Sequence, residues 1–94
     1  MIHKTAIVHS KAKISSNVKI GPYSIIGPNV EINENSEIQS HVSIIGNTKI
    51  GNNVDIAGGS GVIKDIPNNS KVMGYPAKNI RDFLRENKWY TNQQ

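Results

Sequence analysis

Cysteine is absent from this 94-residue sequence, and aromatic residues are few: one tryptophan, one phenylalanine and three tyrosines. The absence of cysteine excludes disulfide bonds, thiolate nucleophiles and cysteine-ligated zinc sites. The histidines His3, His9 and His41 are far apart in the sequence, so they could hold a metal only if folding or self-association brought them together. We therefore expect no metal centre and no bound cofactor.

Long apolar runs are also missing. No stretch approaches the roughly 18 apolar residues of a membrane-spanning helix, and the opening MIHKTAIVH lacks the apolar segment of a signal peptide. We therefore expect a soluble, cytoplasmic protein without a membrane span. The formal net charge of +4 is compatible with acidic partners. Nucleic acid is a poor candidate, because basic residues stack with acidic ones in the coils predicted below and few aromatics are available for base stacking.

What the sequence does contain is a repeat of six residues. Isoleucine or valine occupies every sixth position without a miss: Ile2, Val8, Ile14, Ile20, Ile26, Ile32, Ile38, Ile44, Ile50, Ile56 and Val62. A period of six fits neither a helix nor a simple amphipathic strand, but it fits short strands that each end in a tight corner. Asparagines suited to such corners lie three residues after grid positions, at Asn17, Asn29, Asn35, Asn47 and Asn53. Three strand-and-corner units make a coil of eighteen residues, so each residue stacks on the one eighteen positions away.

This grid, together with motifs such as IGPY at residues 20–23, resembles the hexapeptide-repeat acyltransferase family. The resemblance, and not the periodicity, implies a left-handed parallel β-helix; an ordinary β-sandwich would require the spacing to be accidental. We expect an all-β fold of about 3.5 coils over residues 2–64, then a loop and extended exit over 65–79. A C-terminal helix over 80–89, capped by Asn79, completes the chain.

One face of the predicted prism is apolar, whereas the other two carry stacked charges. We predict self-association through this face, at residues 7–9, 25–27, 43–45 and 61–63, and the family resemblance implies three-fold symmetry. The predicted trimer interface consists of Ile7, His9, Ile25, Ile45 and Ile63. The alternative is that the subunit's own C-terminal helix covers Ile45 and Ile63.

The two halves resemble different members of the lipid A pathway. IGPYSIIGPNVEI (20–32) and SHVSIIGNTKIG (40–51) are similar to the first coils of UDP-N-acetylglucosamine O-acyltransferases. AGGSGVIKDIPNNSKVMGYPAKNIRDFLRENK (57–88) is similar to the end of UDP-3-O-acylglucosamine N-acyltransferases. The histidine segments of both families, IHRGT-like and AHNV-like, are absent.

The resemblance therefore implies a truncated or minimised acyltransferase, whose ancestral activity transfers an acyl group from acyl carrier protein to a UDP-glucosamine derivative. The alternative is a catalytically silent trimeric scaffold or gene remnant, and the sequence alone leaves open whether the protein is an enzyme.

His41 is the remaining candidate for a general base, which would take a proton from the acceptor as it attacks an acyl thioester. The eighteen-residue spacing stacks it between Tyr23 and Gly59. The alternative is a structural corner histidine that packs on Tyr23 and bonds a backbone carbonyl. We also predict that Tyr23, Gly58 and Gly59 line a ligand cleft, where the glycines would admit a pantetheine arm; alternatively, the glycines only mark the end of the last coil.

The C-terminal segment is basic. The resemblance implies that Lys78, Arg81, Arg85 and Lys88 contact an acidic acyl carrier protein by electrostatic attraction. The alternative is a solvated helix surface without a partner. The acceptor implied by the resemblance is a UDP-sugar.

Overall fold

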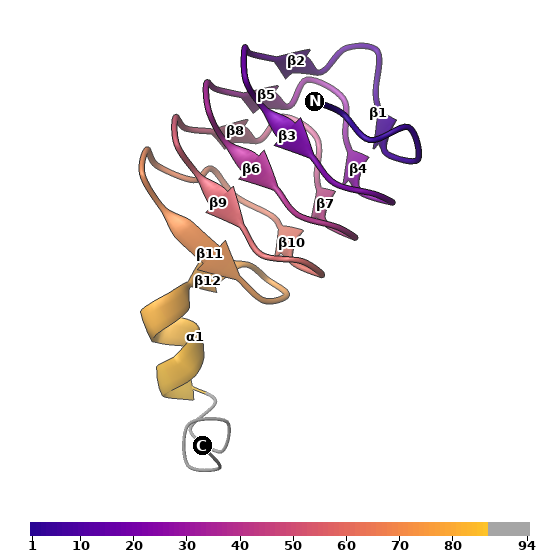
Figure 1. Ribbon diagram of the computed structural model, residues 1–94. Coiled ribbons are helices and arrows are strands. Elements are labelled where there is room, and N and C mark those ends of the chain that lie inside the picture. The colour runs from indigo at the N-terminus through magenta and orange to yellow at the C-terminus, as the bar shows by residue number, and fades with distance from the viewer. Residues whose placement is uncertain (87–94) are drawn as a thin grey trace.

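The computed structural model describes residues 1–86 of the chain, which wind in successive coils around one axis (Figure 1). Each coil consists of short strands separated by tight turns. The strands of the repeat region are β1 (Ile7–Val8), β2 (Lys13–Ile14), β3 (Lys19–Ile20), β4 (Ile25–Ile26), β5 (Glu31–Ile32), β6 (Glu37–Ile38), β7 (Ser43–Ile44), β8 (Lys49–Ile50), β9 (Asp55–Ile56) and β10 (Gly61–Val62). They are followed by β11 (Lys71–Met73), β12 (Lys78–Asn79) and the helix α1 (Ile80–Glu86).

Three parallel sheets form the faces of a prism. The first has the order β1-β4-β7-β10, the second β2-β5-β8, and the third β3-β6-β9-β11, to which β12 adds in antiparallel orientation. Paired residues in the repeat are eighteen apart, as Ile7 with Ile25 and Lys13 with Glu31. The fold is a left-handed parallel β-helix of about four turns, which confirms the predicted fold class.

The isoleucines and valines of the grid fill the interior of the prism. Every grid residue from Ile20 to Val62 is at most 2% exposed. Burial of one such side chain stabilises the fold by about 1.5–3 kcal/mol, so the stacked grid is the main source of stability. In the first coil, Val8 and Ile14 are only half-buried and Ile2 is exposed, since no described coil lies above them.

Serine hydroxyls inside the prism tie neighbouring coils together. Ser36 Oγ donates to the carbonyl of Gly51 at 2.7 Å and accepts from the N–H of Val54 at 3.0 Å. Ser24 makes the equivalent pair of bonds to Gln39 and Val42. Within residues 1–86, every buried side-chain nitrogen and oxygen has a hydrogen-bond partner.

From residue 17 to residue 59, one residue in each turn of the repeat adopts the left-handed conformation, which agrees with the period of six. These residues recur every six positions: Asn17, Tyr23, Asn29, Asn35, His41, Asn47, Asn53 and Gly59. The predicted corner asparagines are thereby confirmed. Asparagine and glycine adopt positive φ at little cost, whereas tyrosine does so at a larger one. Tyr23 (φ 60°), His41 (φ 57°) and Gly59 (φ 75°) occupy one edge of the prism, and asparagines occupy the other two.

Stacking continues past residue 64, with a coil that is two residues shorter. Ile66 pairs with Ile50 and Lys71 with Asp55, so the paired residues are sixteen apart. The carboxylate of Asp65 accepts the backbone N–H of Lys49 at 2.8 Å, a position that backbone carbonyls fill in the regular coils. This shortening displaces the grid after Val62 and extends the pairing through Met73.

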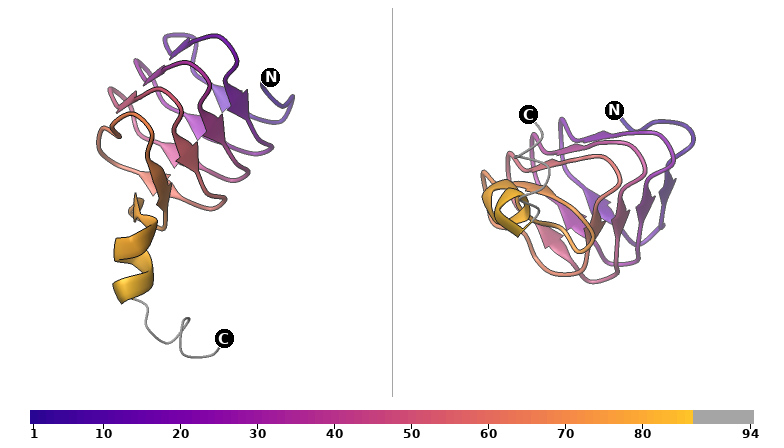
Figure 2. Two further views of the ribbon diagram at one scale, coloured as in Figure 1. Left: turned by 60° about the vertical axis from the view of Figure 1, so that its left-hand side comes forward. Right: turned by 90° about the horizontal axis from the view of Figure 1, so that it is seen from below.

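The helix begins after Asn79, whose Oδ1 accepts the backbone N–H of Arg81 at 3.0 Å, as predicted for a capping residue. It contacts β11 and β12 and points away from the end of the prism (Figure 2). The helix was expected over residues 80–89, and the last three of these positions lie outside the described residues. Lys88, one of the predicted contacts for acyl carrier protein, also lies outside them. No helix within residues 1–86 has the length and apolarity needed to cross a membrane.

Candidate functional site

The face formed by β1, β4, β7 and β10 exposes four isoleucines. Ile7 is 64% exposed, Ile25 is 50% exposed, and Ile45 and Ile63 are each 51% exposed. We call these four residues the apolar strip. The strip remains open along the subunit, because α1 contacts β11 and β12 and leaves Ile45 and Ile63 exposed. The alternative that the subunit's own helix covers these two residues does not apply to the described helix.

At the lower end of this face, Tyr75 replaces the missing side chain of Gly61. A Cβ atom on Gly61 would overlap with the ring of Tyr75, which is itself 79% exposed. Two backbone bonds hold this arrangement: Gly61 donates to Gly74 at 2.9 Å, and Ala77 donates to Gly61 at 2.7 Å. The ring of Tyr75 therefore lies on the last strand of the face that carries the strip. Sequence reasoning missed this contact, although a glycine in register with Ile7 and Ile25 was a signal for it.

The edge of the prism that leads into this face carries Tyr23 and His41. Their ring centroids are 5.3 Å apart and the ring planes are tilted by 33°. Backbone bonds stack the same edge, since His41 donates to Pro22 at 2.9 Å and Gly59 donates to Ser40 at 3.0 Å. We call Tyr23, His41, Gly58 and Gly59 the corner column. The fold brings these four predicted site residues together beside the strip.

His41 is exposed and is held through its backbone and through the tyrosine ring. The hydrogen bond described for His41 within residues 1–86 comes from its main-chain N–H. His9 differs, since its Nδ1 accepts the backbone N–H of Lys11 at 3.1 Å. His3 Nδ1 likewise accepts the backbone N–H of Thr5 at 3.2 Å. The imidazole of His41 is therefore exposed at this edge, with the ring of Tyr23 beside it.

The two glycines of the corner column differ in their surroundings. A Cβ on Gly58 would lie 3.3 Å from the carbonyl oxygen of Ser40. A Cβ on Gly59 would meet nothing within 4 Å, so its requirement for glycine comes from φ and not from crowding. The surface over Gly59 is open, and a ligand can approach the backbone there.

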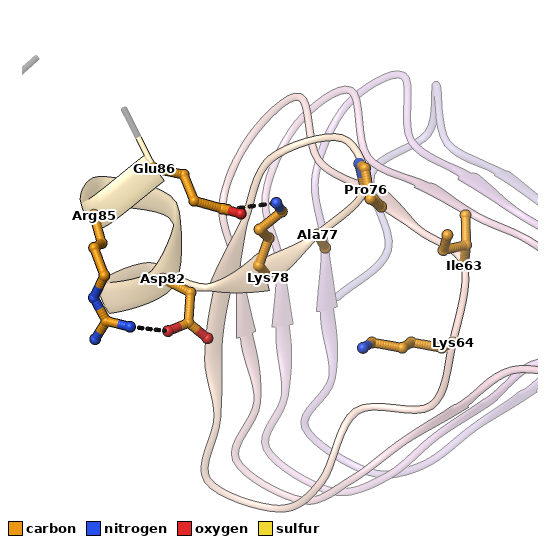
Figure 3. A pocket seen from close by; sticks show the side chains of 8 residues that line it. All are labelled: Ile63, Lys64, Pro76, Ala77, Lys78, Asp82, Arg85 and Glu86. Atoms are coloured by element: carbon orange, nitrogen blue, oxygen red, sulfur yellow. Dashed lines mark hydrogen bonds and ion pairs between the residues drawn. The ribbon is translucent and has the colours of Figure 1, made fainter. Parts of the chain in front are cut away.

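A pocket of about 530 Å³ separates the strip's lower end from α1 (Figure 3). Ile63, Lys64 and Ala77 line it on the prism side, and Lys78 and Glu86 line it on the helix side. Lys78 forms an ion pair with Glu86. The Lys64 ammonium has no ion pair within residues 1–86 and lines this pocket.

The predicted contacts for acyl carrier protein that the structure describes lie at this end, on β12 and α1. Arg81 is exposed, Arg85 forms an ion pair with Asp82 at 3.5 Å, and Lys78 is occupied by Glu86. The carboxylates of Asp82 and Glu86 reduce the positive field that a partner would meet. In the part of the chain that the structure describes, no group of three or more potential metal ligands comes together.

Comparisons with known proteins agree with the repeat and the fold. A family model described as bacterial transferase hexapeptide (six repeats) matches residues 1–34. Serine acetyltransferase from Neisseria gonorrhoeae, solved in complex with serine, is 29% identical with a TM-score of 0.78; the match covers 83% of this chain and 36% of that one. Serine acetyltransferase from Brucella abortus strain S19 is 27% identical with a TM-score of 0.73, covering 84% and 38%.

A hexapeptide-repeat acetyltransferase from Vibrio cholerae O1 biovar eltor, complexed with acetyl coenzyme A, shares the fold at 20% identity and a TM-score of 0.58, covering 86% of this chain and 69% of that one. No curated protein sequence matches the chain significantly. The chain spans about a third of the length of the serine acetyltransferases that it matches. It therefore shares the hexapeptide repeat pattern of transferases over residues 1–34, and its structural neighbours include acetyltransferases.

Proposed function

We propose that this protein is an acyltransferase of the hexapeptide-repeat type, which moves an acyl group from a thioester to a hydroxyl or amine. The observation that carries the proposal is the likeness at 27–29% identity to serine acetyltransferases over more than four fifths of this chain. The corner column adds a second support, since it places an exposed imidazole beside an open glycine surface.

In this mechanism the imidazole of His41 acts as general base. It takes the proton from the acceptor hydroxyl or amine as the acceptor's oxygen or nitrogen attacks the thioester carbonyl carbon. A new ester or amide bond forms as the carbon–sulfur bond breaks. The imidazolium then returns the proton to the departing thiolate, so His41 ends the cycle neutral. Stacking on Tyr23 holds the ring at the edge of the prism.

The reacting groups would meet in a cleft between subunits of a trimer. Four isoleucines that are each at least half exposed line up in one strip, and association through them would bury this apolar surface. The corner column lies along the edge that enters the same face, so a neighbour bound to the strip would form the opposite wall of the cleft. His9 borders this interface as well.

The finer assignment that we propose is transfer from acyl carrier protein to a UDP-glucosamine derivative. It is supported by the similarity of residues 57–88 to the end of lipid A N-acyltransferases and by the exposed Arg81 on α1. Lys78 and Arg85 contribute less to such an encounter, because both are ion-paired within the C-terminal segment.

A thioester assay tests the proposal. Release of free thiol would be followed with acetyl coenzyme A or acyl carrier protein as donor, and with serine or UDP-N-acetylglucosamine as acceptor. We expect acceptor-dependent release that falls by a factor of about 10² to 10⁴ in His41→Ala. The matched control His3→Ala removes an exposed imidazole at the top of the prism and should retain full activity.

The outcomes separate the two functional hypotheses. A His41→Ala variant with full activity would exclude His41 as the base. If no donor and acceptor pair gives more thiol release than the His41→Ala background, the protein is instead a catalytically silent trimeric scaffold. The missing histidine segments noted in the sequence favour that second candidate.

A further inference from the structure

The net positive charge of the chain arises at one end of the prism. Residues 1–30 contain four lysines and no aspartate or glutamate. The seven remaining basic residues are matched by seven acidic residues, all of which follow residue 30. The whole formal net charge of +4 therefore belongs to the first coil and the beginning of the second.

These lysines surround the upper end of the prism instead of forming a patch on one side. Lys4 and Lys11 lie in turns at two different edges, and Lys13 and Lys19 lie on two different sheets. All four are exposed. Lys19 forms an ion pair with Glu37, with 3.8 Å between Nζ and Oε1. The other three lysines have no ion pair within residues 1–86.

The centre of this end is apolar. Met1 is 89% exposed and Ile2 is 44% exposed, while Val8 and Ile14 are half-buried. β1 and β2 are the outermost strands of their sheets here, so they are paired on one side only (Figure 1). The end of the prism is thus a small apolar surface surrounded by four lysines, of which Lys4, Lys11 and Lys13 have no ion pair within residues 1–86.

We propose that the N-terminal end of the prism binds the surface of an anionic lipid bilayer. Apolar side chains within a ring of lysines match the boundary between acyl chains and negatively charged headgroups. The unpaired edges of β1 and β2 restrict this contact to the headgroup level, where water and phosphate oxygens satisfy backbone N–H groups. Lysines on several sides of one end suit an extended anionic surface, which favours a bilayer over a compact acidic protein.

A second copy of the chain fits this end poorly. Head-to-head contact would bring two rings of four lysines together without any acid from residues 1–30, and like charges repel. The apolar strip meets this end at Ile7 and runs from there along the side of the prism, whereas Met1 and Ile2 lie outside the strip. The proposal therefore does not rest on the acyltransferase function or on the trimer.

Sedimentation with vesicles tests this proposal on the full chain. We expect binding to vesicles of phosphatidylcholine with about one third phosphatidylglycerol, little binding to phosphatidylcholine alone, and loss of binding as salt rises. The triple variant Lys4→Gln, Lys11→Gln, Lys13→Gln should partition about a hundredfold more weakly onto the anionic vesicles. Ile2→Ser should weaken binding while leaving its salt dependence unchanged.

The matched control is Lys49→Gln, Lys64→Gln, Lys71→Gln, which removes the same charge from exposed positions in later coils. It should bind as the unmodified protein does, and circular dichroism would verify that both triple variants are folded. Absence of binding to anionic vesicles, or equal losses in the two triple variants, would overturn the proposal. Binding to soluble polyglutamate without binding to vesicles would also overturn it and would identify the end as a site for acidic polymers.

Discussion

The ring of Tyr75 occupies the space that a side chain on Gly61 would fill, so the exit segment and the last strand of the prism interlock. The interlock lies at the lower end of the face that carries the apolar strip. It fixes where the chain leaves the prism, because Gly61 also bonds through its backbone to Gly74 and Ala77.

A side chain at residue 61 should therefore cost stability only while Tyr75 is present. We expect Gly61→Ala to lower the free energy of unfolding by about 1 kcal/mol, as in other cases of overpacking. In the Tyr75→Ala background the same change should be neutral or slightly favourable, since alanine restricts the unfolded chain more than glycine does. Urea unfolding of the four proteins at one chain concentration gives the coupling. Equal costs of Gly61→Ala in both backgrounds would show that the overlap has no energetic consequence.

The hydroxyl of Ser36 should be essential to the stacking of its coil with the next. Removing it leaves the carbonyl of Gly51 and the N–H of Val54 buried without their partner. We expect Ser36→Ala to reduce the free energy of unfolding by about 1–3 kcal/mol. Ser16→Ala is the control, because Ser16 is exposed in a turn outside the apolar face, and it should change stability by less than about 0.5 kcal/mol. A larger loss in the control would contradict this account of the core.

Tyr23 should be a site where stability and function oppose each other. Its φ of 60° is one that asparagine accepts at the other corners, so Tyr23→Asn should raise the free energy of unfolding by about 1 kcal/mol. The same variant removes the ring that holds His41, and it should therefore slow acyl transfer. Asn35→Ala, at a corner with φ 63°, serves as the reference for the cost of an unsuited residue and should be destabilised. A destabilised Tyr23→Asn would mean that stacking on His41 outweighs the backbone strain.

The repeat made the fold predictable, because the sequence pattern of one strand and its turn recurs every six residues. The buried grid from Ile20 to Val62 and the left-handed asparagine corners follow from one rule applied coil after coil. The eighteen-residue spacing likewise placed Tyr23 over His41, and their rings lie 5.3 Å apart.

Contacts that occur only once in the structure could not be predicted from the six-residue repeat. In the sixteen-residue coil, the carboxylate of Asp65 replaces a backbone carbonyl as the acceptor for the N–H of Lys49. The six-residue repeat does not predict this replacement. The packing of Tyr75 on Gly61 joins two segments whose relative position is set by the turn after β11.

Light scattering across a dilution series tests the central claim most directly, since the proposed cleft exists only in an assembled protein. We predict the mass of three chains, and dissociation to one chain in the variant Ile25→Glu, Ile45→Glu, because charges on the apolar strip would be buried in the interface. A folded monomer at all concentrations would contradict the intersubunit site. A trimer that persists in the double variant would show that the strip is not the interface.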